Sequence, residues 1–286
     1  MLTITLILNP LLMLFVPLIL GVWLCKKLGV RGSLFGVGAL TFVGSQVVHI
    51  PLNAGVAKLF SDGIIPLPPE SLRGPLLALG LGLSAGVCEE IARHLSFRFW
   101  VKDVRNWARG MVFGAGHGGV ESIIVGVVTI LSVVNVFALK GADVDGLVAK
   151  GVNAEQAELI VAQLSDVWSN RWWEPLMGSF ERAYAITFHL AASLLVMMGV
   201  VRRSWVWLFA AIALHTALNA TAVYTAHILK WDPVWVQLCG VIFGLGCLAI
   251  ILKLKEQLES SDEEESAPIE PIQPQRVSVA DGLEDG

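Results

Sequence analysis

Charged residues are scarce in this chain. Only 15% of the 286 residues are Asp, Glu, Lys or Arg, whereas 55% are hydrophobic, and the mean hydropathy is +0.68. Soluble domains usually contain about 25% charged residues. The composition therefore excludes an ordinary soluble domain and predicts a polytopic membrane protein. The net charge is −4, and nothing in the composition implies a nucleic-acid partner.

Cysteines are few, and they are far apart. The four are Cys25, Cys88, Cys239 and Cys247. They lie in or beside apolar segments and lack the close spacing of a zinc ribbon or a disulfide framework. We expect them to be reduced side chains that contribute to packing.

Long apolar runs are abundant. A helix needs about 20 apolar residues to cross about 30 Å of hydrocarbon, so the sequence predicts an all-α bundle of about seven transmembrane helices. Their predicted ranges are 2–25, 34–60, 74–97, 107–137, 175–200, 204–228 and 233–254. The first run has no basic residue before it and no small-x-small cleavage site, which favours a membrane helix over a signal peptide.

The distribution of Lys and Arg predicts the orientation of the bundle. Eleven of these residues fall beside one end of the predicted helices and six beside the other. Because the more basic side faces the cytoplasm, we expect the amino terminus outside and the carboxyl terminus in the cytoplasm.

The sequence divides into a membrane domain, residues 1–255, and a tail, residues 256–286. The tail is acidic, contains proline and is poor in aromatic residues, so we expect it to be disordered and cytoplasmic. Within the membrane domain, the predicted external loop 138–174 contains NAEQAELIVAQLSDVW, where Asn153 can cap an amphipathic helix. This helix is either a simple loop element or a lid over a site.

Ionisable residues inside the predicted helices form a layer. At about 1.5 Å of rise per residue, four side chains on four different helices lie about 12 to 16 Å from the cytoplasmic end. They are Glu89, His117, His189 and His215. Charged groups at membrane depth are costly and often functional, so the sequence predicts that these side chains meet.

Spacing within each helix supports this convergence. Residues four apart share a helix face, and four such pairs occur: Glu89 with Arg93, Glu90 with His94, His117 with Glu121, and His215 with Asn219. A second polar row, nearer the outer surface, contains Gln46, His49 and Asn53. The glycine-rich segment 113–119 should let neighbouring helices approach His117 closely. The alternative is that these groups only fix helix packing, as a buried ion pair does.

Adjacent glutamates in the membrane suit a hydrolytic reaction. Glu89 and Glu90 cannot both ionise cheaply in a medium of low dielectric constant, so one can stay protonated while the other acts as a base. A glutamate base can activate water, and imidazole or amide donors can hold the oxyanion that forms at an attacked carbonyl. These residue types therefore favour peptide hydrolysis inside the membrane.

Three motifs carry a resemblance to a known superfamily: Glu89-Glu90 with Arg93, the segment FGAGH at 113–117, and HTALN at 215–219. This pattern is similar to that of the CPBP or ABI superfamily, which includes the type II CAAX prenyl endopeptidases, glutamate-dependent intramembrane proteases. Within it, the chain most resembles the bacterial YhfC family. That likeness rests on SQVVHIPLN at 45–53, GHGGVES at 116–122 and ERAYAITFH at 181–189.

The resemblance implies roles for particular residues. Glu89 would be the water-activating base, and Glu90 and Arg93 would assist it. His117, His215 and Asn219 would bind water or the oxyanion. The residues expected to support this site are Glu121, His189, Gln46 and His49. The prenyl endopeptidases have EExxxR where this chain has EExxR, which places Arg93 about 100° from the family position on the helix.

Three hypotheses follow. The first is an intramembrane glutamic-type endopeptidase of a bacterial plasma membrane that needs no cofactor and cleaves a membrane-embedded or lipidated polypeptide. The second is a zinc-dependent intramembrane metalloprotease, with ligands drawn from His117, Glu121, His189 and His215. The third is a transporter or scaffold without enzymatic activity. It is weakened by the absence of repeated halves in the sequence.

Overall fold

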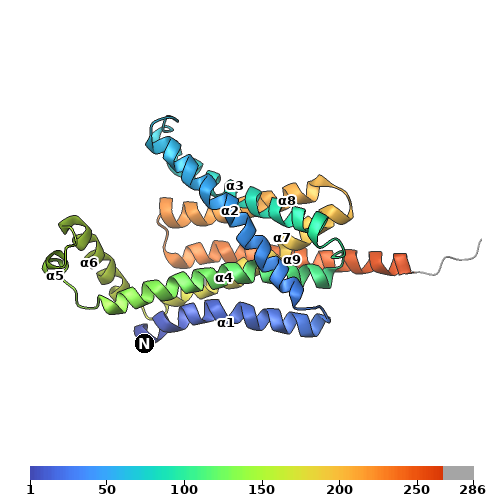
Figure 1. The fold of residues 1–286 in the computed structure, drawn as a ribbon, viewed down its shortest axis with the longest axis horizontal. Helices are drawn as coiled ribbons and strands as arrows, with labels where there is room; N and C mark the ends of the chain where they lie inside the picture. Colours follow the sequence, from blue (N-terminus) through green and yellow to red (C-terminus); the bar gives the residue numbers. More distant parts are fainter. Residues whose placement is uncertain (267–286) are drawn as a thin grey trace, which may run out of the picture.

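The computed structural model describes residues 1–266, and the side chains of residues 1–258. Seven long helices run side by side (Figure 1): α1 (Leu2–Leu28), α2 (Ser33–Ser61), α3 (Glu70–Leu95), α4 (Trp107–Ala138), α7 (Met177–Val201), α8 (Trp205–Val223) and α9 (Pro233–Ser266). Shorter elements are η1 (Ser96–Trp100), α5 (Val144–Ala149), α6 (Ala154–Ser169), η2 (Glu174–Leu176) and η3 (Tyr224–Ile228). Residues 1–266 contain no strand, so the predicted all-α class is confirmed.

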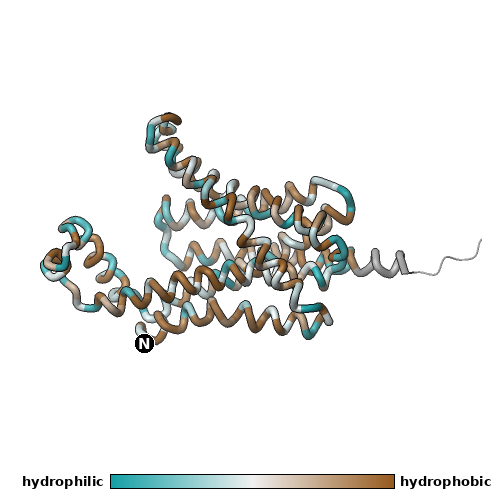
Figure 2. Tube along the Cα trace, in the orientation of Figure 1, coloured by the Kyte–Doolittle hydropathy of each residue, from teal (hydrophilic) through white to brown (hydrophobic). Residues whose placement is uncertain are grey.

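The long helices have the length and composition of membrane spans. Seven segments of residues 1–258 are long and apolar enough to cross a bilayer, and they coincide with the seven predicted runs. Figure 2 shows apolar residues along the long helices and polar residues gathered at their ends and in α5 and α6. Large apolar side chains such as Val47 and Val206 are mostly exposed. Such a surface suits hydrocarbon rather than water, and the chain is a membrane protein. Its orientation and its cellular membrane stay predictions.

Helix α7 forms the centre of the bundle. It packs against α1, α3, α4, α8 and α9, and residues 188–199 are all buried. The buried faces of α4, α8 and α9 complete the same core. The four cysteines are free thiols, as expected.

Glycines on α4 bring its neighbours close. A Cβ atom at Gly118 would lie 2.8 Å from the His189 side chain on α7. A Cβ atom at Gly38 on α2 would lie 3.0 Å from the backbone nitrogen of His117. Real Cβ atoms are rarely that close to a neighbour, so a larger residue would force these helices apart. The prediction that segment 113–119 permits close approach is confirmed.

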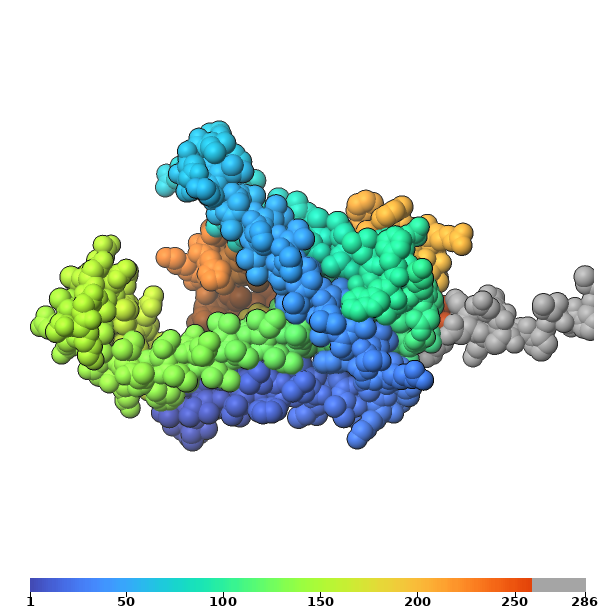
Figure 3. Space-filling model, in the orientation of Figure 1, coloured from blue at the N-terminus to red at the C-terminus, as the bar shows by residue number. Residues whose placement is uncertain are grey.

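The bundle is less tightly closed at the end that carries α5 and α6. The carboxyl-terminal half of α2 and the start of α3 lean away from α4 (Figure 1), and the space-filling view shows a hollow there with α9 at its back (Figure 3). Beside it, α6 begins after Asn153, whose side-chain oxygen accepts a 2.8 Å hydrogen bond from the Gln156 N–H. Trp168 of α6 packs edge-on against Phe137 at the end of α4.

The last helix is longer than its predicted span. Helix α9 runs to Ser266, past residue 255, where the sequence analysis placed the end of the membrane domain. The reason is visible in the pattern of burial: Cys247, Ile251, Leu254 and Leu258 are buried at helical spacing, so one apolar face continues across that boundary. The remainder of the predicted tail, 267–286, lies outside the described residues.

Candidate active site

Polar side chains from four helices meet in the core. We name this set the buried centre: Glu89, Glu90 and Arg93 on α3, His117 on α4, His189 on α7 and His215 on α8. All six are buried. The predicted layer of acids and imidazoles therefore exists, and its members come within contact distance of one another.

On one side of the buried centre, Glu90 is held by two partners. Its Oε1 accepts a hydrogen bond from Nη1 of Arg93, and His215 Nδ1 lies 2.7 Å from the same oxygen. The side chains of Glu90 and Arg93 have no exposed surface. Glu90 therefore acts as the counter-ion that allows Arg93 to be buried.

On the other side, Glu89 is held more loosely. Its Oε2 lies 3.2 Å from His117 Nε2 and 3.8 Å from Arg93 Nη2, and its Oε1 accepts a 3.4 Å hydrogen bond from Gln46 Nε2. Glu89, unlike Glu90, lines a cavity of about 80 Å³. Of the two adjacent carboxylates, Glu89 is the one that a small molecule in this cavity can reach.

A chain of charged groups leads away from the buried centre along α7. Nη2 of Arg93 lies 2.5 Å from His189 Nδ1, and the other ring nitrogen of His189 contacts the Glu121 carboxylate. Glu121 accepts a 2.8 Å hydrogen bond from Arg182, which also donates to Glu181. Sequence reasoning missed Arg182, although it lies seven residues before His189, which is two helical turns on the same face.

Five of the ten predicted site residues line the cavity. Its polar lining includes Glu89, Glu121, Glu181, Arg182, Tyr184, His189, His215, Asn219 and Thr221. Asn219, one turn after His215 on α8, thus faces the same space, as the four-residue spacing predicted.

The predicted polar row on α2 also joins the site. His49 Nδ1 lies 3.0 Å from Gln46 Oε1, and His49 Nε2 lies 3.0 Å from the Asn53 amide and 3.3 Å from Ser84 Oγ on α3. A hydrogen-bonded series therefore runs from Glu89 through Gln46 to His49. His94 is different, because its ring stacks on Trp205 at 5.0 Å instead of entering the buried centre.

Three members of the buried centre form a set with the chemistry of a metal site. Glu89, His117 and His189 offer ligand atoms that all lie within 4.8 Å of one another. Two imidazoles and one carboxylate are a donor set that zinc accepts in catalytic sites. His117 Nδ1 is also buried without a hydrogen-bond partner. The residues therefore fit a metal ion, and the expectation that no cofactor is needed is not supported.

The metal set differs from the one that the sequence suggested. Among the described residues, the set does not include Glu121 or His215. Glu89 takes their place. The four zinc ligands that the sequence predicts do not include Glu89, which the resemblance gives the role of the water-activating base.

Fold and site together define a polytopic membrane protein with a carboxylate and histidine centre buried in its helical bundle. The chain belongs to the YhfC family, because the family model described as "YhfC intramembrane metalloprotease" matches residues 12–236. It is 35% identical over 210 residues to "Uncharacterized membrane protein YhfC" of Bacillus subtilis (strain 168), across 72% of this chain and 78% of that protein. No solved structure matches the chain. Membership of the wider CPBP superfamily stays a prediction.

Proposed function

We propose that this protein is an intramembrane endopeptidase that hydrolyses a peptide bond of a membrane-embedded or lipidated polypeptide at Glu89. One observation carries the proposal. Of two adjacent buried glutamates, Glu90 is neutralised by Arg93 and His215, while Glu89 faces the cavity. A carboxylate that is buried, reachable and beside an imidazole is equipped to take a proton from water.

The residues around Glu89 suggest how the reaction proceeds. Glu89 accepts a proton from a water molecule in the cavity, and the resulting hydroxide attacks the peptide carbonyl. His117, 3.2 Å from Glu89, orients its carboxylate. His215 is paired with Glu90 through Nδ1, so in its protonated form it retains an Nε2–H that can bind the oxyanion in the cavity that Asn219 also lines. As the carbon–nitrogen bond breaks, Glu89 returns the proton to the leaving amine.

A metal-dependent form of the same activity is the second candidate. It is favoured by the set of Glu89, His117 and His189 and by the description of the family. These three residues would hold the ion, which supplies Lewis-acid activation of water when bound. Glu89 would then be a ligand, and Glu121 would fix the orientation of His189 from its second ring nitrogen.

The activity is tested on full-length protein in liposomes that contain a library of single-span peptides, with cleavage products identified by mass spectrometry. Glu89→Gln should abolish cleavage and retain bound peptides, because the amide keeps the shape of the side chain but cannot accept the proton. Glu70→Gln is the matched control, since Glu70 lies in the first turn of the same helix. Equal cleavage by wild type and Glu89→Gln would reject the assigned role.

Metal content separates the two forms. In the metal-dependent form, purified protein contains about one zinc per chain, the metal is lost in His117→Ala, and chelators stop cleavage. In the glutamic form, cleavage continues in the presence of chelators and does not depend on metal content. Zinc content is measured without any substrate, and the chelator test uses the peptide library described above.

A further inference from the structure

A basic groove lies at the end of the bundle opposite α5 and α6. Two adjoining hollows of about 670 Å³ and 520 Å³ share Arg98, Phe99, Val200 and Arg203. We name this region the basic groove and define it by Arg98, Lys102, Arg105 and Arg203 together with Phe99 and Trp205. It runs between the end of α3 and the turn from α7 to α8. Among the described residues, no acidic side chain lines either hollow.

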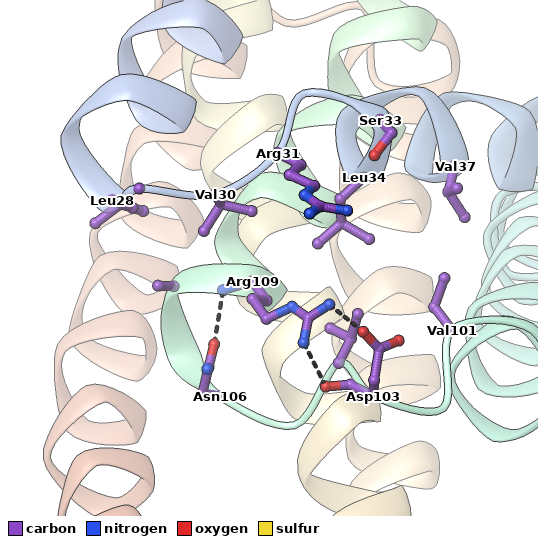
Figure 4. A pocket seen from close by; sticks show the side chains of 13 residues that line it. Leu28, Val30, Arg31, Ser33, Leu34, Val37, Val101, Asp103, Asn106 and Arg109 are labelled. Atoms are coloured by element: carbon purple, nitrogen blue, oxygen red, sulfur yellow. Dashed lines mark hydrogen bonds and ion pairs between the residues drawn. The ribbon is translucent and has the colours of Figure 1, made fainter.

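A neighbouring hollow at the same end is different. It has a volume of about 620 Å³ and lies between the α1–α2 turn and the loop before α4 (Figure 4). There Arg109 donates to the carboxylate of Asp103 and, at 2.8 Å, to its backbone oxygen. Hydrogen bonds from Arg109 hold the pKa of the Asp103 carboxyl below its usual range. In this hollow the carboxylate of Asp103 balances the charge of Arg109. No carboxylate does the same among the residues that line the basic groove.

The backbone at Arg203 places an arginine where glycine is favoured. Helices α1 and α7 end in the same backbone motif, in which a residue with positive φ is followed by an N–H that donates to the carbonyl five residues earlier. In α1 the N–H of Val30 donates to the carbonyl of Cys25, and in α7 the N–H of Ser204 donates to that of Gly199, both at 3.0 Å. In α1 the residue is Gly29, with φ of 64°, and in α7 it is Arg203, with φ of 52°. A side chain is strained in this conformation. The strain is tolerated at the position where the side chain enters the basic groove.

The surroundings of the basic groove match a phospholipid. Phe99 and Trp205 are 61% and 63% exposed and continue the apolar surface of the spans. The cationic groups line the same hollows at the ends of the spans, and basic groups at the ends of spans attract the phosphates of anionic lipids. Guanidinium groups bind phosphate oxygens through paired hydrogen bonds. Arg105 already donates to the carbonyls of Val104 and Phe97, so Arg98, Lys102 and Arg203 are the groups left to bind an anion, and Arg98 and Arg203 are the two that line both hollows.

We propose that the basic groove is a binding site for the phosphate of an anionic phospholipid, with Arg98 and Arg203 on the headgroup and the acyl chains over Phe99 and Trp205. In the orientation that the sequence predicts, this lipid belongs to the cytoplasmic leaflet, which carries the anionic lipids. The site also gives a role to His94, which does not enter the buried centre. His94 stacks on Trp205 and thereby supports the wall of the groove.

The test measures lipid binding to full-length protein in detergent by native mass spectrometry, with phosphatidylglycerol and phosphatidylcholine as probes. Wild type should prefer phosphatidylglycerol. Arg98→Gln combined with Arg203→Gly should weaken phosphatidylglycerol binding by about 25-fold, since each surface cation contributes about 5-fold. Binding of phosphatidylcholine should be unchanged. Because glycine relieves the strain at position 203, the thermal unfolding temperature of Arg203→Gly alone should not fall.

Matched controls make the result specific. Lys26→Gln combined with Arg31→Gln removes the same charge at the same end outside the groove and should keep the preference, as should Arg98→Lys with Arg203→Lys. An equal loss in the Lys26 and Arg31 control would overturn the proposal in favour of general surface charge. Full competition by inorganic phosphate would overturn the lipid as ligand. Peptidase activity plays no part in these measurements.

Discussion

The two adjacent glutamates of the buried centre differ in burial and in how closely their neighbours hold them. Glu90 is 0% exposed and bonded to Arg93 and His215, while Glu89 is 5% exposed and keeps its neighbours at 3.2 Å or more. Adjacent positions on a helix point about 100° apart, so Glu90 faces α8 and Glu89 faces α2 and α4. The comparison shows that helix geometry alone can give one carboxylate a structural task and leave its neighbour available for chemistry.

The strongest test of this difference removes the Glu90 carboxylate. Glu90→Ala leaves the Arg93 guanidinium buried without its counter-ion, which should lower the free energy of unfolding by about 3 to 5 kcal/mol. Unfolding in detergent, followed by loss of helical circular dichroism, measures this. Glu89→Gln should change the same free energy by less than about 1 kcal/mol, because its hydrogen bonds are long.

A double variant shows whether the loss comes from the stranded charge. Glu90→Leu combined with Arg93→Met removes both charges and should recover most of the lost stability, since a buried ion pair contributes little beyond an apolar pair of similar size. If the double variant is as unstable as Glu90→Ala, the uncompensated charge of Arg93 is not the cause of the lost stability, and the structural role assigned to Glu90 is wrong.

A smaller effect is expected in the charged series along α7. Arg182→Gln removes a 2.8 Å hydrogen bond to Glu121, which in turn contacts His189. Loss of such an outer partner typically costs about 10- to 100-fold in activity or metal affinity. We expect turnover or zinc content to fall by this factor, measured in the liposome assay and by metal analysis. Arg171→Gln, which removes an exposed arginine just before α7, is the control and should leave both unchanged.

The sequence could predict the depth of the buried centre but not its pairing. Depth follows from a rise of about 1.5 Å per residue along each span, and for this reason Glu89, His117, His189 and His215 were placed in one layer. Which side chains touch depends on how helices are rotated against each other. That rotation is set by contacts such as Gly118 against His189, and for this reason the sequence could not predict the Glu90 and His215 pair.

The same reasoning explains where spacing misled. His94 is four residues from Glu90 and lies on the same broad face of α3, but this spacing does not bring its side chain into the buried centre. The His94 ring stacks on Trp205 instead. The Gln46 and His49 row, in contrast, was predicted on one face and is joined to Glu89 in the structure. A row of three polar residues defines a direction on a helix better than a pair does.

The smallest effect belongs to Gln46, at the edge of the Glu89 side. Its amide donates a 3.4 Å hydrogen bond to Glu89 and is itself oriented by His49. A single hydrogen bond contributes about 0.5 to 1.5 kcal/mol, so Gln46→Leu should slow cleavage by about 2- to 12-fold. The free energy of unfolding should change by no more than about 1.5 kcal/mol. Gln163→Leu, on exposed α6, should cleave at the wild-type rate. A complete loss of cleavage in Gln46→Leu would mean that Glu89 is held as firmly as Glu90, and the contrast between the two sides would then be wrong.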